Sequence, residues 1–190
     1  MKRLIYTVSL GLVLGLFLLT ATYSETPPQP KDQLKSPVDS EKLKQIKPIP
    51  VPKCPDLVAE KIEFTIVSRT GKFSGKVRIT GVVKNAGSEP YISGPNQQAV
   101  HLYEFIPGGS PRLVAKKNFQ NLNPGQQITV TYERNWDAAS TSEGEFPSSY
   151  RVVIVYDPDI RMDGNPKNDD CNLNNNEKER SGADINRLFK

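Results

Sequence analysis

The stretch Tyr150-Arg-Val-Val-Ile-Val-Tyr156 decides the fold class of this 190-residue chain. A short run of β-branched and aromatic residues bounded by polar segments is typical of a β-strand. Because nearly every position of this run is apolar, we expect the strand to lie in the centre of a sheet. The acidic, Asn-rich segment Asp157–Asn176 follows it directly, and we expect that segment to close the domain.

Five stretches upstream of this strand have the same character and are separated by turn signals. They are Leu57–Val67, Lys76–Lys84, Ala99–Ile106, Arg112–Phe119 and Gln127–Arg134. Apolar and polar residues alternate most clearly in the second of them, and a period of two with one polar face indicates an antiparallel sheet. Strands this short bury their apolar faces only by packing as two sheets, so the sequence predicts an all-β sandwich of about seven strands. We expect its last strand to come from the stretch around Cys171.

Turn residues separate the predicted strands. Asn85-Ala-Gly-Ser88 ends the second strand with residues that tolerate positive φ. Leu122-Asn-Pro-Gly-Gln126 precedes the fifth strand, and its Pro-Gly pair is favoured at the two central positions of a type II turn. These signals support several short strands rather than a few long elements.

Two features leave alternatives open. Trp136 follows the fifth strand, where we expect it to cap the core, the alternative being a platform for a sugar ring. The C-terminal stretch 183–190 puts Ile185, Leu188 and Phe189 on one face if it is helical, but it is too short for a stable isolated helix. It either docks on the sandwich or frays.

Residues 1–53 differ in composition from the rest of the chain. Residues 1–24 combine a basic start, a short apolar run and small residues, which is the pattern of a secretory signal peptide. Residues 25–53 are polar and rich in proline, which predicts a disordered linker or stalk. We therefore expect a secreted or periplasmic protein of the cell envelope, with no membrane span once the signal is removed.

The charge of the chain is nearly balanced. The 25 basic residues fall to 23 when Lys2 and Arg3 leave with the signal, against 21 acidic residues. No basic stripe with interleaved aromatic residues is present. We therefore expect no nucleic-acid partner.

Cys54 and Cys171 are the only two cysteines. In an oxidising compartment a lone pair forms one structural disulfide by default. A redox-active pair would normally lie close together in sequence, as in Cys-x-x-Cys. We therefore expect a structural Cys54–Cys171 bridge.

Five short motifs, in their order and spacing, resemble CARDB, the cell adhesion related domain found in bacteria. They are Pro55-Asp-Leu57, Asn85-Ala-Gly87, Leu122-Asn-Pro-Gly125, Tyr150-x-Val-x-Ile-x-Tyr-Asp157 and Asn174-Asn-Asn176. The resemblance implies an immunoglobulin-like or fibronectin-III-like antiparallel β-sandwich over residues 54–178, followed by a tail, residues 179–190. It implies a surface or adhesion role only loosely, because one fold hosts many functions. Asp169-Asp-Cys-Asn-Leu-Asn174 departs from the family's glutamates and Asn pairs, so the domain looks like a disulfide-stapled variant.

Catalytic motifs are missing from the sequence, and we expect no catalytic residues and no enzyme activity. The single histidine, His101, lies in the middle of a predicted strand, which favours a position on the face of a sheet. Glu143 and Glu145 are paired carboxylates, but they lie on a Ser- and Gly-rich loop that we expect to be solvated.

Calcium is the one metal hypothesis that the sequence raises. Asp157, Asp159 and Asp163 are the candidate ligands, because they supply hard oxygen atoms close together. Nearby side chains that add oxygen atoms are Asn165, Asn168, Asp169 and Asp170. The spacing departs from that of an EF-hand loop, since Arg161 occupies the fifth position. We favour the alternative, a polar turn whose Asp and Asn side chains bond their own backbone, and we expect no cofactor.

These observations predict a non-catalytic exported module for binding or adhesion, which recognises a protein or a glycan. Contacts are expected from loops at the ends of the sandwich: 91–98, 107–111 and 137–149. The alternative is a structural accessory subunit of a bacterial envelope or secretion assembly, which would also need a spacer and no active site.

Overall fold

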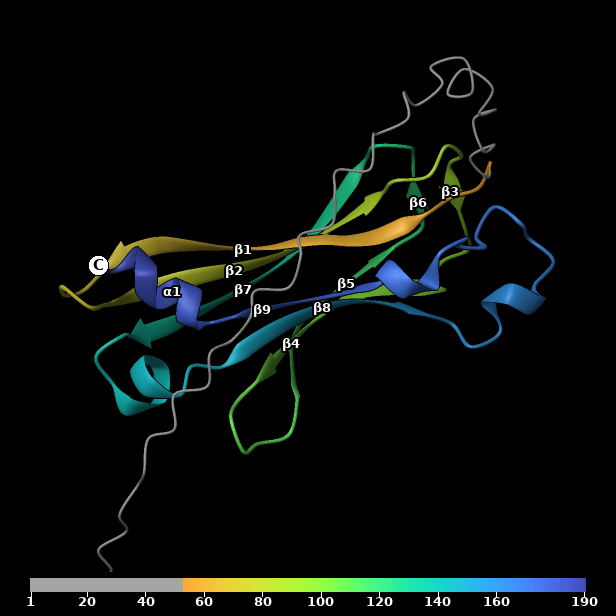
Figure 1. Ribbon diagram of the computed structural model, residues 1–190. Coiled ribbons are helices and arrows are strands. Elements are labelled where there is room, and N and C mark those ends of the chain that lie inside the picture. The colour runs from red at the N-terminus through yellow and green to blue at the C-terminus, as the bar shows by residue number, and fades with distance from the viewer. Residues whose placement is uncertain (1–52) are drawn as a thin grey trace, which may run out of the picture. The chain divides into compact units, whose positions relative to one another are not determined.

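The structure, a computed structural model, describes residues 53–190. The predicted signal peptide, residues 1–24, and all of the predicted linker except Lys53 lie outside the described residues. The described residues form nine β-strands in antiparallel sheets and one α-helix near the C-terminal end (Figure 1). Among them, no helix has the length and hydropathy needed to cross a membrane.

Two sheets pack around a shared core. The first has the order β1-β2-β7, formed by β1 (Leu57–Arg69), β2 (Ser74–Asn85) and β7 (Gln127–Asp137). The second has the order β5-β4-β8-β9, formed by β5 (Arg112–Phe119), β4 (Gln98–Phe105), β8 (Ser149–Tyr156) and β9 (Glu177–Ser181). A separate short pair consists of β3 (Tyr91–Ile92) and β6 (Asn121–Leu122).

The predicted all-β sandwich is confirmed, and the described residues contain nine strands rather than about seven. On β2, Val77 and Ile79 are buried in the core, whereas Lys76 and Arg78 face solvent. The strand β8 lies between β4 and β9, as its continuous apolar sequence predicts. The strands β3 and β6 have two residues each, too few to show a hydrophobic period.

The closing strand lies further along the chain than predicted. Cys171 is in a loop, and β9 completes the second sheet by pairing with β8. The prediction was wrong because β9 contains only polar and charged residues, so hydrophobic periodicity gives no signal for it. Arg180 of β9 packs against the core in the place where an apolar side chain would be expected. Its guanidinium lies 4.5 Å from the centroid of the Phe64 ring and donates to the backbone oxygen of Ile62.

Cys54 and Cys171 form the predicted disulfide across 117 positions of sequence. The bond joins the residues before β1 to the loop that follows β8. The backbone N–H of Cys171 also donates to the carbonyl oxygen of Pro55, at 3.1 Å. A disulfide indicates an oxidising, extracellular environment.

The C-terminal stretch docks on the sandwich as helix α1 (Ala183–Leu188). Ile185 and Phe189 are buried, while Leu188 is partly exposed. Trp136 is only 2% exposed, and its Nε1–H donates to Oδ1 of Asn186 at 2.8 Å. Trp136 therefore caps the core, and its buried ring is not a sugar platform.

Replacement of Asn186 by Ala tests how α1 is held. The Nδ2 of Asn186 also donates to the backbone oxygen of Glu143, at 2.7 Å, so this side chain joins α1 to both β7 and the loop after it. We expect Asn186→Ala to lower the free energy of unfolding by about 1–3 kcal/mol in urea titrations, because the buried Trp136 N–H loses its acceptor. The control is Arg187→Ala, on the exposed side of α1, and equal stability of the two variants would contradict this role.

Candidate functional site

The sandwich has two ends that differ in structure (Figure 1). β4 begins and β8 ends at the disulfide end, which contains the Cys54–Cys171 bridge. β4 ends and β8 begins at the helix end, which contains α1. The predicted contact loop 91–98 lies at the disulfide end, whereas the loops 107–111 and 137–149 lie at the helix end. The three loops therefore do not form one surface.

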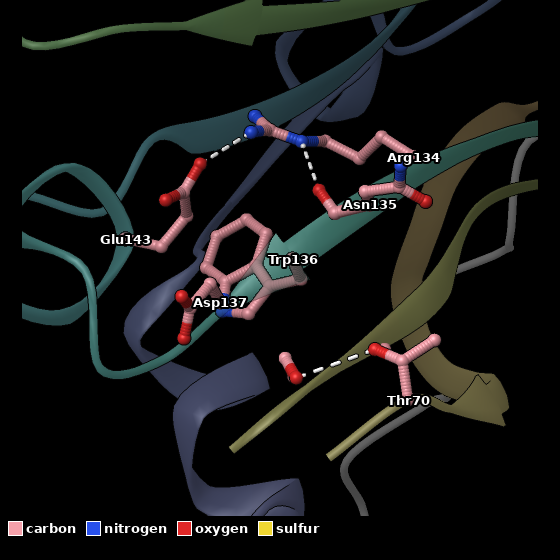
Figure 2. Close-up of a pocket in the computed structure, with 8 residues that line it drawn as sticks. Thr70, Arg134, Asn135, Trp136, Asp137 and Glu143 are labelled. Atoms are coloured by element: carbon pink, nitrogen blue, oxygen red, sulfur yellow. Dashed lines mark hydrogen bonds and ion pairs between the residues drawn. The ribbon is translucent and has the colours of Figure 1, made fainter.

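A pocket of about 450 Å³ lies at the helix end, between the β1–β2 hairpin and the end of β7. Figure 2 shows Arg134 extending past Trp136 towards Glu143, with which it forms an ion pair. On the opposite wall, Oγ1 of Thr70 donates to Oγ of Ser74 at 3.2 Å. The lining side chains therefore bond within each wall: Thr70 to Ser74 in the β1–β2 hairpin, and Arg134 on β7 to Glu143 in the following loop.

Behind this pocket, a buried carboxylate connects the two sheets. Glu104 on β4 has no exposed surface, and it accepts hydrogen bonds from Arg112, Arg134 and the Tyr150 hydroxyl. Burial pushes the pKa of Glu104 upward, but the hydrogen bonds from the two arginines outweigh it and hold the pKa below its usual value. The sequence analysis did not identify Glu104 as a functional or structural residue. The alternation along β4 offered a signal, because Glu104 lies four positions after the apolar Val100 and therefore points to the same, buried face of the strand.

Glu143 and Glu145 have different surroundings. Glu143 accepts hydrogen bonds from the Ser140 and Ser142 hydroxyls as well as pairing with Arg134. Burial raises the pKa of Glu143, but these bonds outweigh it and leave the pKa below its usual value. Glu145 is exposed to solvent. Glu143 therefore fixes the loop after β7.

The carboxylates predicted as calcium ligands bond mainly to their own loop. Oδ1 of Asp157 accepts from the backbone N–H of Asp159 at 3.3 Å, and Oδ1 of Asp163 accepts from that of Asn165 at 2.8 Å. The other oxygen of Asp163 accepts from Nδ2 of Asn168 at 2.6 Å. No group of three His, Cys, Asp or Glu side chains within residues 53–190 is arranged to hold a metal ion. The structure does not bring the three candidates together as a metal site.

A row of aromatic rings lies on the outer surface of the second sheet. The inward side chains of β4 are buried, so His101, Tyr103 and Phe105 face outward. The ring centroids of His101 and Tyr103 are 5.8 Å apart, and those of Tyr103 and Phe105 are 6.5 Å apart. Nδ1 of His101 lies 3.1 Å from the Tyr103 hydroxyl, and burial together with Lys116 lowers the pKa of His101. His101 thus has the sheet-face position expected from the sequence.

Neighbouring strands widen this row into a surface that we call the β4 face. It consists of the three rings together with Leu113, Arg151 and Val153. Leu113 on β5 and Arg151 on β8 are both paired with Tyr103, and Leu113 is 45% exposed. The Arg151 guanidinium lies 4.7 Å from the centroid of the Phe105 ring. The sequence analysis did not identify the β4 face, because its residues come together only through the pairing register of β5, β4 and β8.

Opposite charges border the β4 face. Lys116 on β5 is paired with His101 on one side, and Glu177 and Glu179 on β9 border the other side. Glu179 forms an ion pair with Arg151 at 2.7 Å. The face is therefore apolar and aromatic in its middle, basic along β5 and acidic along β9.

The chain matches no protein-family model and no curated protein. Among solved structures, it is similar to part of β-glucosidase 3B from Thermotoga neapolitana, with 14% identity and a TM-score of 0.32 over 67% of this chain. Part of β-glucuronidase 2 from Bacteroides uniformis matches 52% of this chain, with 23% identity and a TM-score of 0.29. The chain spans only 16% and 10% of the lengths of these two proteins. TM-scores this low carry no argument about fold or function.

Proposed function

We propose that this protein is a non-catalytic, exported binding module that recognises a protein partner through the β4 face. The observation that carries the proposal is the row His101, Tyr103 and Phe105 on the open side of the second sheet. Each of the three rings is partly exposed, and Leu113 beside them is 45% exposed. Contiguous apolar surface that is exposed on a soluble domain marks an interaction site. The disulfide supports an oxidising, extracellular location, and a secreted or periplasmic position is part of the proposal.

The composition of the β4 face favours a protein over a glycan. Aromatic residues and arginine are enriched in protein interfaces, and the aliphatic side chains of Leu113 and Val153 suit an apolar interface centre. The charged borders define the partner further: it carries acidic groups opposite Lys116 and basic groups opposite Glu177. Two of the predicted contact loops, 107–111 and 137–149, adjoin the ends of β4 and β8 at the helix end.

Addition of a partner strand to the β5 edge of the second sheet fits the structure less well. The strand β5 is an edge of the second sheet, but it carries Lys116 and Lys117. Its register with β4 is also irregular between Leu102 and Tyr103. Lysines and bulges are devices that oppose edge-to-edge pairing. The face, rather than this edge, is therefore the proposed contact.

Replacement of Tyr103 by Ala tests the proposal. A photo-crosslinking amino acid at position 103 in the native envelope identifies the partner, and the affinity of the purified pair is then measured for each variant. We expect Tyr103→Ala to weaken binding by about 30-fold, corresponding to roughly 2 kcal/mol for an aromatic residue in the interface centre. The variant should remain folded, because Tyr103 faces outward.

The matched control is Phe73→Ala, which removes an exposed aromatic ring from the β1–β2 hairpin, outside the β4 face. This variant should bind as the wild type does. Equal loss in both variants, or no loss in Tyr103→Ala, would refute the β4 face as the contact. Specific binding to an array of purified glycans, with no crosslinked protein, would replace the protein partner by a glycan.

A further inference from the structure

The strands at the edges of the two sheets differ in how well they are protected against pairing with another strand. β1 has two register shifts against β2, and the backbone oxygen of its Ile62 accepts from Arg180. β5 carries lysines and a register shift, and β9 has five residues, nearly all of them charged. Register shifts, lysines and short length oppose edge-to-edge pairing. The fourth edge strand, β7, pairs with β2 over 11 residues without a register shift and contains no lysine or proline, so it is the least protected edge.

The hydrogen bonds at the two ends of β7 show which of its residues bond to β2. Before the strand, the backbone N–H of Asn85 donates to the oxygen of Gln126, and after it the N–H of Ala138 donates to the oxygen of Phe73. Both bonds continue the register between β2 and β7. In an antiparallel pair, the residues that exchange hydrogen bonds alternate along the strand. The even-numbered residues of β7 therefore bond to β2, and the backbone groups of the odd-numbered residues point outward.

The outward backbone groups form a row along the open edge of the first sheet. Among residues 53–190, β7 forms a ladder with β2 alone, and the backbone oxygen of Asn135 accepts from Nε of Arg134 at 3.0 Å. β5 of the other sheet reaches β7 through a side chain, since Arg112 donates to the Tyr132 hydroxyl at 3.0 Å. A row of N–H and C=O groups without strand partners is a template for a further strand. It consists of the groups of Gln127, Thr129, Thr131 and Glu133 and the N–H of Asn135.

The sequence of β7 is complementary to itself. When two copies pair antiparallel about a two-fold axis at Thr131, each Thr131 lies opposite the other, and its outward N–H and C=O groups meet their counterparts. In the same register, Thr129 lies opposite Glu133, and Val130 lies opposite Tyr132. Threonine pairs and pairs of aromatic with β-branched residues are favourable across strands. The strand therefore offers matching side chains on both faces of the paired sheet.

The charges of β7 do not oppose this pairing. Glu133 forms ion pairs with two cations of β2, and Arg134 forms ion pairs with Glu104 and Glu143. The axis at Thr131 also places the two copies of Glu133 on opposite sides of the centre, and likewise the two copies of Arg134. No like charges therefore lie directly opposite one another, an arrangement that would be destabilising.

We propose that β7 pairs with β7 of a second copy of this chain, which joins the first sheets of two molecules into one continuous sheet. β7 belongs to the first sheet and the β4 face to the second, so the inference does not rest on the proposed function. Pairing of one edge strand makes a small interface, and we expect a dimer that dissociates at micromolar concentrations. The dimer presents two β4 faces, which increases the avidity for a partner that offers repeated sites.

The mass of the full chain, measured by light scattering after size-exclusion chromatography, tests the proposal. We expect the mass to rise towards twice that of one chain as the concentration increases. Thr131→Pro removes an outward N–H and no bond to β2, and proline is tolerated on an edge strand at such a position. We expect it to raise the dissociation constant of the dimer at least about 30-fold, because the hydrogen bonds at the axis are lost.

Thr131→Val is the matched control, because it keeps both the N–H and the β-branched shape, and this variant should dimerise as the wild type does. Thr131→Lys is a second disruptive variant if proline impairs folding, since it sets two lysines opposite each other at the axis. A wild type that stays monomeric at every concentration would overturn the proposal. A dimer that is equally strong in the Lys, Pro and Val variants would place the contact elsewhere and overturn it as well.

Hydrogen exchange locates the contact. The backbone amides of Thr129, Thr131 and Glu133 should exchange more slowly at high than at low concentration, whereas the amide of Val130, bonded to β2, should change less. Unchanged exchange of the three outward amides in a dimeric sample would refute β7 as the interface. Protection that appears only when another protein is added, with this chain still monomeric, would replace the second copy by a foreign strand.

Discussion

Loss of the Cys54–Cys171 disulfide is expected to lower the free energy of unfolding by about 4–5 kcal/mol, because the bond closes a long loop in the unfolded chain. The two cysteines are 117 positions apart. For a domain of this size, the loss corresponds to a decrease in melting temperature of roughly 10–25 °C. The structure adds a local reason: the bond holds the residues before β1 against the loop that follows β8.

The measurement compares the wild type with the double variant Cys54→Ser/Cys171→Ser, each with and without dithiothreitol. Cys171 is exposed, so the reductant has access to the bond. Reduction should bring the wild type to the melting temperature of the double variant and leave the double variant unchanged. A double variant that melts within about 2 °C of the oxidised wild type would contradict the prediction.

Local sequence patterns were sufficient to predict much of the fold. The alternation around Val77 and Ile79 predicts the inward face of β2, and the continuous apolar run of β8 predicts its central place. The turn before β7 also follows local chemistry, since Gly125 has a φ of +79° after Pro124. These features are determined by residues that are neighbours in the sequence, so they can be predicted from the sequence alone.

Features that depend on distant contacts could not be predicted in this way. Gly87 was expected to tolerate positive φ, but it is not among the positive-φ residues. This position requires glycine because a Cβ there would lie 2.3 Å from the backbone oxygen of Cys54. Asn85, beside it, accepts from the backbone N–H of Asp56 at 3.2 Å and donates to the backbone oxygen of Leu122 at 2.8 Å. Only the folded arrangement brings these partners together.

The functional surfaces show the same limit. Tyr103 is one of several aromatic residues in the sequence, and its importance appears only when pairing places Leu113 and Arg151 beside it. Likewise, the sequence offered the Asp- and Asn-rich loop only as a calcium hypothesis, and it favoured a polar turn. Which of its oxygen atoms lack donors depends on contacts such as that between Asn168 and Asp163.

Glu104→Gln is expected to lower the free energy of unfolding by about 3–5 kcal/mol, because it breaks a buried ion cluster while keeping the shape of the side chain. The Arg134 side chain is only 22% exposed and would keep Glu143 as its one carboxylate partner. The cluster joins β4, β5 and β8 of one sheet to β7 of the other, so its loss weakens the packing between sheets. Urea titration at neutral pH measures the effect.

The matched control is Glu133→Gln on β7. Glu133 also bonds two cations, Lys76 at 2.8 Å and Arg78 at 2.6 Å, but these pairs lie on the outer face of the first sheet. Solvent screens such pairs, so this variant should unfold close to the wild type. Because Glu104 and Glu133 have similar partners and differ in burial, the comparison isolates burial as the cause. Equal losses in the two variants would contradict this explanation.

The pH dependence of stability separates the charge of Glu104 from its shape. Burial raises the pKa of Glu104, but hydrogen bonds from Arg112 and Arg134 outweigh it, so the folded-state pKa lies below the usual value of 4.5. Such a carboxyl adds stability above its unfolded pKa, and this contribution is lost as the pH falls through the folded pKa. The difference in unfolding free energy between the wild type and Glu104→Gln should therefore be constant near neutral pH and shrink below about pH 4.5. A difference that stays constant to about pH 3 would show that shape, and not charge, is what Glu104 contributes.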